Sequence, residues 1–270
     1  MKICFIGGGN MATALIGGML GKGFNATQIS VVEINADRRV QLKQDFAVRA
    51  VETASEGVQD SDCIVLAVKP QQLCEVTQQL SQLLNKQQLL ISIAAGVRAT
   101  DLARWSGSQN IVRAMPNTPA LIQSGMTGLY ALPAVSAARR ELAQNILAAV
   151  GETLWFSDEE KLDAVTAISG SGPAYVFYLI EALQQAAIEQ GLNAEVARKL
   201  SIATFLGASK LAASSADDVS VLRTKVTSKN GTTDRALLSL AANQVAQHIA
   251  EAAEAAAVRS REMGDELGKT

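Results

Sequence analysis

The chain is poor in aromatic residues, histidine and cysteine, and it has no block of one charge. Aromatic residues make up 4% of its 270 residues, and His248 is its single histidine. Cys4, Cys63 and Cys74 are odd in number, and their spacing fits neither a Cys-x-x-Cys pair nor a zinc site. We therefore expect reduced thiols, a cytoplasmic location and no metal site. The 24 basic and 26 acidic residues form no basic stripe, which argues against nucleic acid as a partner.

Long hydrophobic runs are also missing. The apolar start of the chain, residues 1–6, stops at Gly7 and is too short for the core of a signal peptide. The alanine-rich stretch 237–258 has the length of a membrane span, but polar residues interrupt it, so it predicts a soluble helix and no membrane partner. The interrupting residues are Asn243, Gln247, His248, Glu251 and Glu254.

The first half of the chain alternates short apolar runs with segments of helical periodicity. This alternation predicts a parallel, doubly wound sheet with helices on both faces, whereas only helical patterns follow Phe156. We therefore predict an α/β Rossmann domain over residues 1–157 and an all-α C-terminal domain over residues 158–270. The predicted strands are residues 3–6, 29–34, 62–68, 89–94 and 111–115. The predicted helices are residues 11–20, 36–46, 72–84, 158–168, 173–190, 194–213 and 217–226, and a long one from about 232 to 263.

A glycine-rich segment lies between the first predicted strand and the first predicted helix. Gly7, Gly9 and Ala12 fit the G-x-G-x-x-G/A fingerprint of dinucleotide-binding proteins. The first glycine permits a tight turn, the second lets a pyrophosphate approach the backbone, and the helix N-terminus offers unpaired N–H groups. The alternative is a glycine-rich turn without a ligand. The fingerprint predicts cofactor contacts from Ile6, Gly7, Gly8, Gly9, Asn10 and Met11.

The end of the second predicted strand carries conflicting signals about the cofactor. Glu33 lies about 20 residues beyond the fingerprint, where an acidic residue accepts hydrogen bonds from the ribose hydroxyls of NAD. A carboxylate there would repel the 2′-phosphate of NADP, yet Arg38 and Arg39 follow at the start of the next helix and could meet that phosphate. The alternative for both arginines is a solvated helix face.

Three later strand ends complete the predicted cofactor site. Ligands of an open parallel sheet bind outside the carboxyl ends of its strands. Lys69 can reach a phosphate or ribose, and the small residues after the next strand leave room for a nicotinamide ring. The next strand ends in a rigid loop with two prolines and Asn117. The predicted contacts from these ends are Val68, Lys69, Pro70, Ala94, Ala95 and Asn117.

Two polar segments interrupt the helical half. Residues 169–175 break one helix and start another, with Pro173 in the first helical turn. Residues 227–233 precede the last long helix, and backbone N–H groups of Gly231, Thr232 and Thr233 could bind a carboxylate there. From the residues alone, a well-capped loop between helices is slightly favoured over a carboxylate site.

Taken in order, these segments resemble the pyrroline-5-carboxylate reductase family. The matching stretches are residues 5–11, 67–71, 92–97, 113–119, 163–166, 169–175 and 226–233, so they extend along the whole chain. The resemblance implies a Rossmann domain followed by a helical dimerisation domain, a homodimer that is often assembled into a ring, and NADPH as the usual cofactor. It implies hydride transfer to the C=N bond of pyrroline-5-carboxylate, giving proline.

The resemblance also assigns the substrate site. It places the substrate carboxylate at residues 228–233, with contacts from Ser228, Gly231, Thr232 and Thr233, and the Thr233 hydroxyl near the ring nitrogen. The family usually has Pro-Gly where this chain has Lys229-Asn230, but asparagine tolerates the left-handed conformation, so we expect the loop to keep its shape. Glu33 departs from the family pattern, which leaves NADH as an alternative cofactor.

The chemistry of the residues favours an imine substrate. A carbonyl reductase usually carries a proton donor, and the lone histidine lies inside the last helix, where we expect an exposed position. An imine is protonated before the hydride arrives, so binding and orientation carry most of the catalysis. A β-hydroxyacid dehydrogenase is one alternative, but Val176 and Ile180 stand where that family has its catalytic lysine and an asparagine. A non-catalytic nicotinamide-nucleotide sensor is the other.

Overall fold

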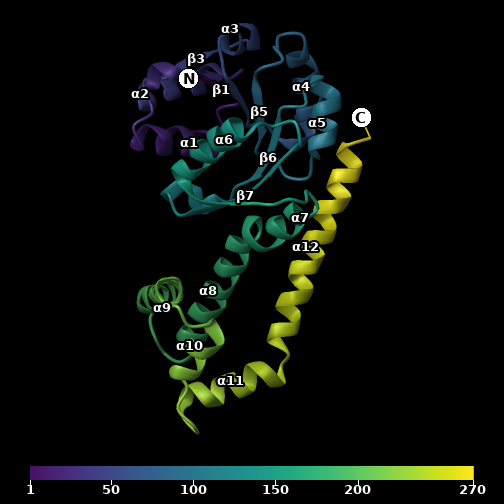
Figure 1. Ribbon diagram of the computed structural model, residues 1–270. Coiled ribbons are helices and arrows are strands. Elements are labelled where there is room, and N and C mark those ends of the chain that lie inside the picture. The colour runs from purple at the N-terminus through teal and green to yellow at the C-terminus, as the bar shows by residue number, and fades with distance from the viewer. Residues whose placement is uncertain (270) are drawn as a thin grey trace. The chain divides into compact units, whose positions relative to one another are not determined.

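The computed structural model describes residues 1–269, and these form two compact units (Figure 1). The first unit comprises Met1–Ser171 together with the end of the chain from Ala255, and the second comprises Gly172–Glu254. Helix α12 (Val245–Leu267) begins in the second unit and ends in the first.

The first unit is built on an eight-stranded sheet of order β3-β2-β1-β4-β5-β6-β7-β8. The strands from β3 to β6 are parallel, as expected. The sequence did not predict β7, which departs from the parallel pattern and pairs antiparallel with β6. Only the short 3₁₀ segment η3 (Thr118–Ile122) connects the two strands, too little chain for the crossover that parallel pairing needs. The strands are β1 (Ile3–Ile6), β2 (Ile29–Val32), β3 (Arg49–Val51), β4 (Cys63–Leu66), β5 (Leu89–Ser92), β6 (Ile111–Met115), β7 (Gly125–Ala131) and β8 (Gly151–Trp155).

Helices cover both faces of this sheet. Helix α1 packs beside α2 and α6, whereas α4 packs beside α5, and right-handed crossovers place these two groups on opposite faces. Strands β1, β4 and β5 are buried along their whole length, as continuous apolar runs predict for parallel strands between two helical layers. The helices are α1 (Asn10–Gly21), α2 (Ala36–Phe46), α3 (Ala54–Val58), α4 (Leu73–Ser81), α5 (Ala99–Ser106) and α6 (Ala137–Leu147).

The segment after β8 packs on the sheet unit. Helix α7 (Lys161–Val165) is followed by a π-helical turn, η5 (Thr166–Gly170), so the helix predicted over residues 158–168 changes its winding midway. A Cβ atom at Gly128 of β7 would lie 2.8 Å from Val165 Cγ1, so the missing side chain lets α7 approach the strand. By contact, the division falls between Ser171 and Gly172, beyond the predicted domain boundary after residue 157.

The second unit is all helical. It contains α8 (Gly172–Glu189), α9 (Ala194–Ser214), α10 (Val219–Lys225), α11 (Thr232–Ala242) and the first turns of α12. The prediction of one long final helix is wrong, because α11 ends before α12 begins. The backbone N–H and the side-chain amide of Asn243 both donate to the Ser239 carbonyl oxygen, and Gln244 then adopts a φ of 53°. This left-handed residue redirects the chain without proline or glycine.

The helical unit has almost no core of its own. Within residues 172–254, which the structure describes in full, only Ala197 and Ser201 are buried. Large apolar side chains are exposed on α8 and α9, among them Phe177, Tyr178 and Leu206. Exposed apolar surface of this extent marks an interaction face. Over residues 1–269, no helix combines the length and the apolar character that crossing a membrane requires.

Candidate active site

The predicted cofactor contacts of the sheet unit gather at one edge of the sheet. They follow β1, β2, β4, β5 and β6, whose carboxyl ends point the same way because these strands are parallel. The structure therefore brings together segments that are up to a hundred residues apart in sequence. The residues at this edge that the sequence predicts as cofactor contacts are Ile6, Gly7, Gly8, Gly9, Asn10, Met11, Glu33, Arg38, Val68, Lys69, Pro70, Ala94, Ala95 and Asn117.

The glycine loop after β1 leaves open space at the start of α1. Gly7 has a φ of 97° and donates its N–H to the Val32 carbonyl oxygen at 2.8 Å. A Cβ atom there would lie 2.8 Å from the Ala67 carbonyl oxygen, so both conformation and space require glycine. A Cβ atom at Gly9 would meet nothing within 4 Å. Gly9 is the N-cap of α1 and provides no side-chain cap, so the helix N-terminus faces open space with unpaired N–H groups. These features fit a dinucleotide.

Glu33 is held against the glycine loop. One carboxylate oxygen accepts a hydrogen bond from the Gly8 N–H at 2.9 Å, and the other accepts from the Asn35 N–H at 2.9 Å. The Asn35 side chain in turn caps α2 by accepting from the Arg38 N–H. The carboxylate is therefore fixed at the end of β2, where the adenosine ribose of a dinucleotide binds in this fold.

The two arginines of α2 differ in what surrounds them. The Arg38 guanidinium donates to the Gly8 carbonyl oxygen at 2.8 Å and also to the hydroxyl of Thr13. Arg39 donates to the Glu33 carbonyl oxygen at 2.8 Å and pairs with Glu52 at 3.0 Å. Arg38 therefore lies beside the glycine loop and also donates to the Gln41 side chain at 2.8 Å, whereas Arg39 joins the end of β2 to the end of β3. Of the two, Arg38 is better placed to meet a 2′-phosphate.

The other strand ends supply small or exposed side chains. Lys69 is exposed, and Pro70 opens the 3₁₀ turn η2 (Pro70–Gln72) that leads into α4. Ala94 is buried and Ala95 half-buried, and the Ala94 N–H lies 3.4 Å from the Ser92 hydroxyl. The chain after β5 is thus free of bulky side chains beside the predicted nicotinamide position.

Asn117 makes structural hydrogen bonds that the sequence did not predict. Its amide nitrogen donates to the Ser169 carbonyl oxygen at 3.2 Å and lies 3.1 Å from the Ser169 hydroxyl. Its amide oxygen accepts from the Met126 N–H at 2.9 Å. Asn117 therefore joins the end of β6 to β7 and to the π-helical turn. A cofactor contact from this residue stays a prediction.

The predicted carboxylate loop lies in the helical unit. The Gly231 N–H donates to the Ser228 carbonyl oxygen at 2.9 Å, which closes a turn over residues 228–231. Asn230 has a φ of 59°, which confirms the left-handed conformation expected where the family usually has glycine. Gly231 caps α11 without a side-chain hydrogen bond, so N–H groups of the first turn, which includes Thr232 and Thr233, are available to an anion.

The cysteines carry no evident chemistry. Cys4 and Cys63 are buried on neighbouring strands, and burial raises the pKa of the Cys4 thiol to about 11. Burial also raises the pKa of Cys63 well above its ordinary value. Both thiols therefore stay protonated and unreactive near neutral pH. Among residues 1–269, no three histidine, cysteine or carboxylate side chains converge as metal ligands.

Comparison with known proteins agrees with this arrangement. The chain is 46% identical over 269 residues to the pyrroline-5-carboxylate reductase of Pseudomonas aeruginosa, covering 99% of this chain and 98% of the relative. The chain belongs to the pyrroline-5-carboxylate reductase family. Residues 159–263 match the family model described as pyrroline-5-carboxylate reductase dimerisation, and residues 2–96 match the model described as NADP oxidoreductase, coenzyme F420-dependent.

Solved structures of pyrroline-5-carboxylate reductases are similar along the whole chain. The structure from Coxiella burnetii has a TM-score of 0.92 at 38% identity and covers 97% of this chain and 98% of its own. That from Plasmodium falciparum, solved with NADP bound, has a TM-score of 0.87 at 30% identity and covers 98% of each chain. Membership of the reductase family sets aside the β-hydroxyacid dehydrogenase alternative, in line with Val176 and Ile180 at the positions of its catalytic pair.

Proposed function

We propose that this protein reduces 1-pyrroline-5-carboxylate to L-proline with NAD(P)H, the last step of proline biosynthesis. The observation that carries the proposal is the similarity to pyrroline-5-carboxylate reductases over the full length, at up to 46% identity. The glycine loop and the uncapped start of α11 supply the two anion sites that this reaction requires, one for a pyrophosphate and one for a carboxylate.

The sheet edge would hold the cofactor, which supplies a hydride from its reduced nicotinamide when it is bound. Backbone N–H groups at the start of α1 bind the pyrophosphate, and the open space at Gly9 admits it. Glu33 and Arg38 lie at the adenosine end, where they set the preference between the two dinucleotides. Ala94 and Ala95 leave room for the nicotinamide.

The carboxylate loop would orient the substrate. Ser228 and the N–H groups of Thr232 and Thr233 bind the substrate carboxylate at the start of α11, while the Gly231 N–H, which donates to the Ser228 carbonyl oxygen, keeps the turn closed. The Thr233 hydroxyl oxygen accepts a hydrogen bond from the protonated ring nitrogen, and Thr233 is the catalytic residue we propose. Because a protonated imine needs no alkoxide to be neutralised, this single hydroxyl and the fixed carboxylate suffice to orient the C=N bond.

Replacing Thr233 by alanine tests that role. We expect kcat/KM for pyrroline-5-carboxylate to fall by about 10- to 100-fold, the effect of losing one hydrogen bond to a charged group. Thr233→Ser keeps the hydroxyl and is the matched control, which we expect to retain most of the activity. Initial rates at saturating cofactor measure both variants, and wild-type turnover by Thr233→Ala would contradict the proposed role.

Initial rates with NADPH and NADH at equal concentration test the function itself. We propose NADPH as the cofactor, with Arg38 meeting the 2′-phosphate once that group displaces the Glu33 carboxylate from the Gly8 N–H. Faster oxidation of NADH would mean instead that Glu33 governs the ribose site through its hydroxyls. Binding of either dinucleotide without turnover of pyrroline-5-carboxylate would contradict the reductase and favour the nucleotide sensor.

We also propose that the working form is a homodimer in the cytoplasm. The helical unit buries only Ala197 and Ser201 by itself, and its family model is a dimerisation model. A second copy is the partner that supplies the missing apolar contacts. A measured mass above that of a dimer would mean that the dimers form a ring. The unpaired cysteines support the location, which cell fractionation tests.

A further inference from the structure

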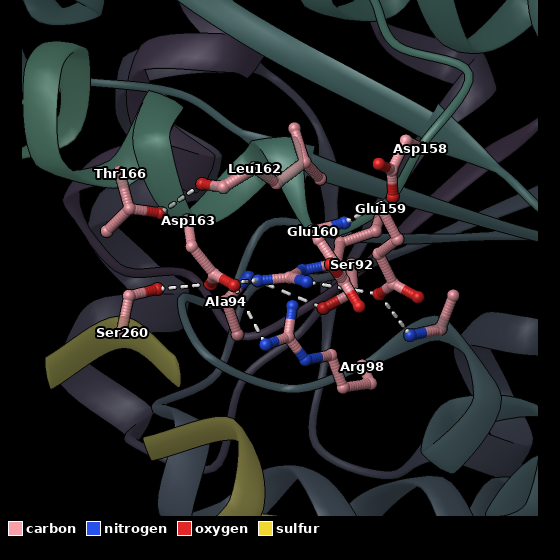
Figure 2. Close-up of polar contacts among 12 residues, drawn as sticks. Ser92, Ala94, Arg98, Asp158, Glu159, Glu160, Leu162, Asp163, Thr166 and Ser260 are labelled. Carbon is pink, nitrogen blue, oxygen red and sulfur yellow. Dashed lines mark hydrogen bonds and ion pairs between the residues drawn. The ribbon is translucent and has the colours of Figure 1, made fainter. Parts of the chain in front are cut away.

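A network of charged side chains joins parts of the sheet unit that are distant in sequence, and its members are buried at Arg113 and Asp163 and half-buried at Arg98 and Glu159. Figure 2 shows its carboxylates, Glu159 and Asp163, facing two guanidinium groups beneath the start of α7. The guanidinium groups belong to Arg98, which precedes α5, and to Arg113 in β6. The end of α12 contributes Ser260. None of these residues belongs to the predicted cofactor or substrate contacts.

Asp163 is the centre of this network. The residue is 1% exposed, and one carboxylate oxygen accepts from Arg98 Nη2 at 2.8 Å. The other oxygen accepts from the Ser260 hydroxyl at 2.7 Å and lies 4.0 Å from Arg113 Nη2. Asp163 therefore binds the loop before α5 and the end of α12 at the same time.

Glu159 fixes the same loop from its other side. One carboxylate oxygen accepts from Arg113 at 3.0 Å and from the Ala99 N–H at 2.7 Å. Ala99 is the first residue of α5, and Arg98, its N-cap, supplies no side-chain cap. Burial lowers the pKa of Arg113, and the adjacent Glu159 carboxylate opposes that shift and keeps the guanidinium charged.

Helix α12 also packs closely against residues 94–98, the loop that precedes α5. A Cβ atom at Gly264 would lie 2.8 Å from the Gly96 carbonyl oxygen, and one at Gly96 would lie 3.1 Å from Met263 Cβ. The loop 94–98 is therefore enclosed between α12, α7 and the start of α5. Its first two residues are the small side chains that the proposed function places beside the nicotinamide.

We propose that Asp163 is a positioning residue for the nicotinamide half of the cofactor. It holds Arg98 and Ser260 and thereby fixes the loop 94–98 at the carboxyl end of β5. Arg113 and Asp163 are buried, and buried charges of opposite sign contribute little net stability compared with apolar residues of the same size, so stability alone does not explain this network. The hydrogen bonds from Arg98 to Asp163 and from the Ala99 N–H to Glu159 restrict the backbone of the loop before α5, which is what a positioning residue does. The inference rests on the proposed cofactor site.

The test separates the two halves of the cofactor. Tryptophan fluorescence or calorimetry measures the dissociation constants of NADP⁺ and of 2′-phospho-ADP-ribose, which lacks the nicotinamide, with NAD⁺ and ADP-ribose as a second matched pair. For Asp163→Asn and Ser260→Ala, we expect binding of the better dinucleotide to weaken by about tenfold. The fragment without nicotinamide should bind within about twofold of wild type, because the glycine loop is unchanged.

A matched control removes a buried serine hydroxyl elsewhere in the sheet unit. The Ser61 hydroxyl donates to the Gly57 carbonyl oxygen at 3.0 Å, and Ser61→Ala should change neither dissociation constant. Equal weakening of dinucleotide and fragment, or unchanged binding of both in folded variants, would overturn the positioning role. If the wild-type protein binds neither dinucleotide, the proposed cofactor site is wrong. The positioning role of Asp163 is then wrong as well, because it rests on that site. Ser260→Ala keeps every charge of the network, so it remains informative where Asp163→Asn fails to fold.

Discussion

We expect the Gly9→Val variant to bind its nicotinamide dinucleotide about 100-fold more weakly than wild type, an effect of one or two lost charge-assisted hydrogen bonds. The backbone of Gly9 has a φ of −70° and a ψ of −177°, which valine adopts without strain, and its Cβ would meet nothing within 4 Å. The added side chain therefore fits the folded protein but fills the space in front of the α1 N-terminus. Titration of the cofactor fluorescence measures the affinity, and the melting temperature should stay at the wild-type value.

A valine at position 7, in contrast, should lower the stability of the fold. Gly7→Val places a side chain 2.8 Å from the Ala67 carbonyl oxygen at a φ of 97°, a conformation that costs a β-branched residue about 1–3 kcal/mol before the clash is counted. Its melting temperature should fall clearly. If Gly9→Val binds the cofactor as tightly as wild type, the pyrophosphate does not lie at the start of α1.

Sequence patterns predicted the elements whose burial is uniform. β1, β4 and β5 are continuous apolar runs between polar turns, and their alternation with helical segments was enough to predict that the strand ends proposed to hold the cofactor share one edge of the sheet. The glycine fingerprint also predicted the positive φ of Gly7. The tight turn between the strand and the helix that meets the phosphate requires a glycine at this position. At these positions the preference of the local sequence agrees with the overall fold, so the structure can be predicted from the sequence.

The sequence patterns did not predict the strands β7 and β8 or the break between α11 and α12. Two glycines interrupt β7, and β8 alternates half-buried and exposed residues, so neither has the apolar run of a central strand. The break between α11 and α12 has no proline or glycine to mark it, because Asn243 ends the helix through its own side chain. Alanine-rich sequence on both sides continues the helical pattern, and only tertiary structure decides where the chain turns.

The network around Asp163 could not be predicted from the sequence, for a related reason. Its members are distributed from residue 98 to residue 260, and no local pattern connects them. One signal was present: Arg113 stands inside the apolar strand β6, and an arginine in such a strand is buried only with a partner. That signal predicts a partner but does not say which of the chain's many carboxylates it is.

Charged substitutions on the helical unit should prevent the chain from dimerising. Phe177 on α8 is 66% exposed and Leu206 on α9 is 55% exposed, in a unit that has almost no core. Phe177→Glu and Leu206→Glu would each bury an ionised carboxylate in the proposed interface, at several kcal/mol per copy. Two-fold symmetry places each substitution in the dimer twice, so the dissociation constant should rise by at least about a thousandfold. Light scattering over a range of concentrations measures the mass.

The surface of the sheet unit supplies the control. Val40 on α2 is 53% exposed, and Val40→Glu should leave the mass unchanged, because the sheet unit has a complete core. In the two helical-unit variants we also expect the circular dichroism signal at 222 nm to fall, since helices that lose their partner lose the apolar contacts that stabilise them. If both variants keep the wild-type mass and helix content, α8 and α9 do not form the interface. The helical unit would then have to be stable with two buried residues, which the conformational entropy of more than eighty ordered residues makes untenable without another partner.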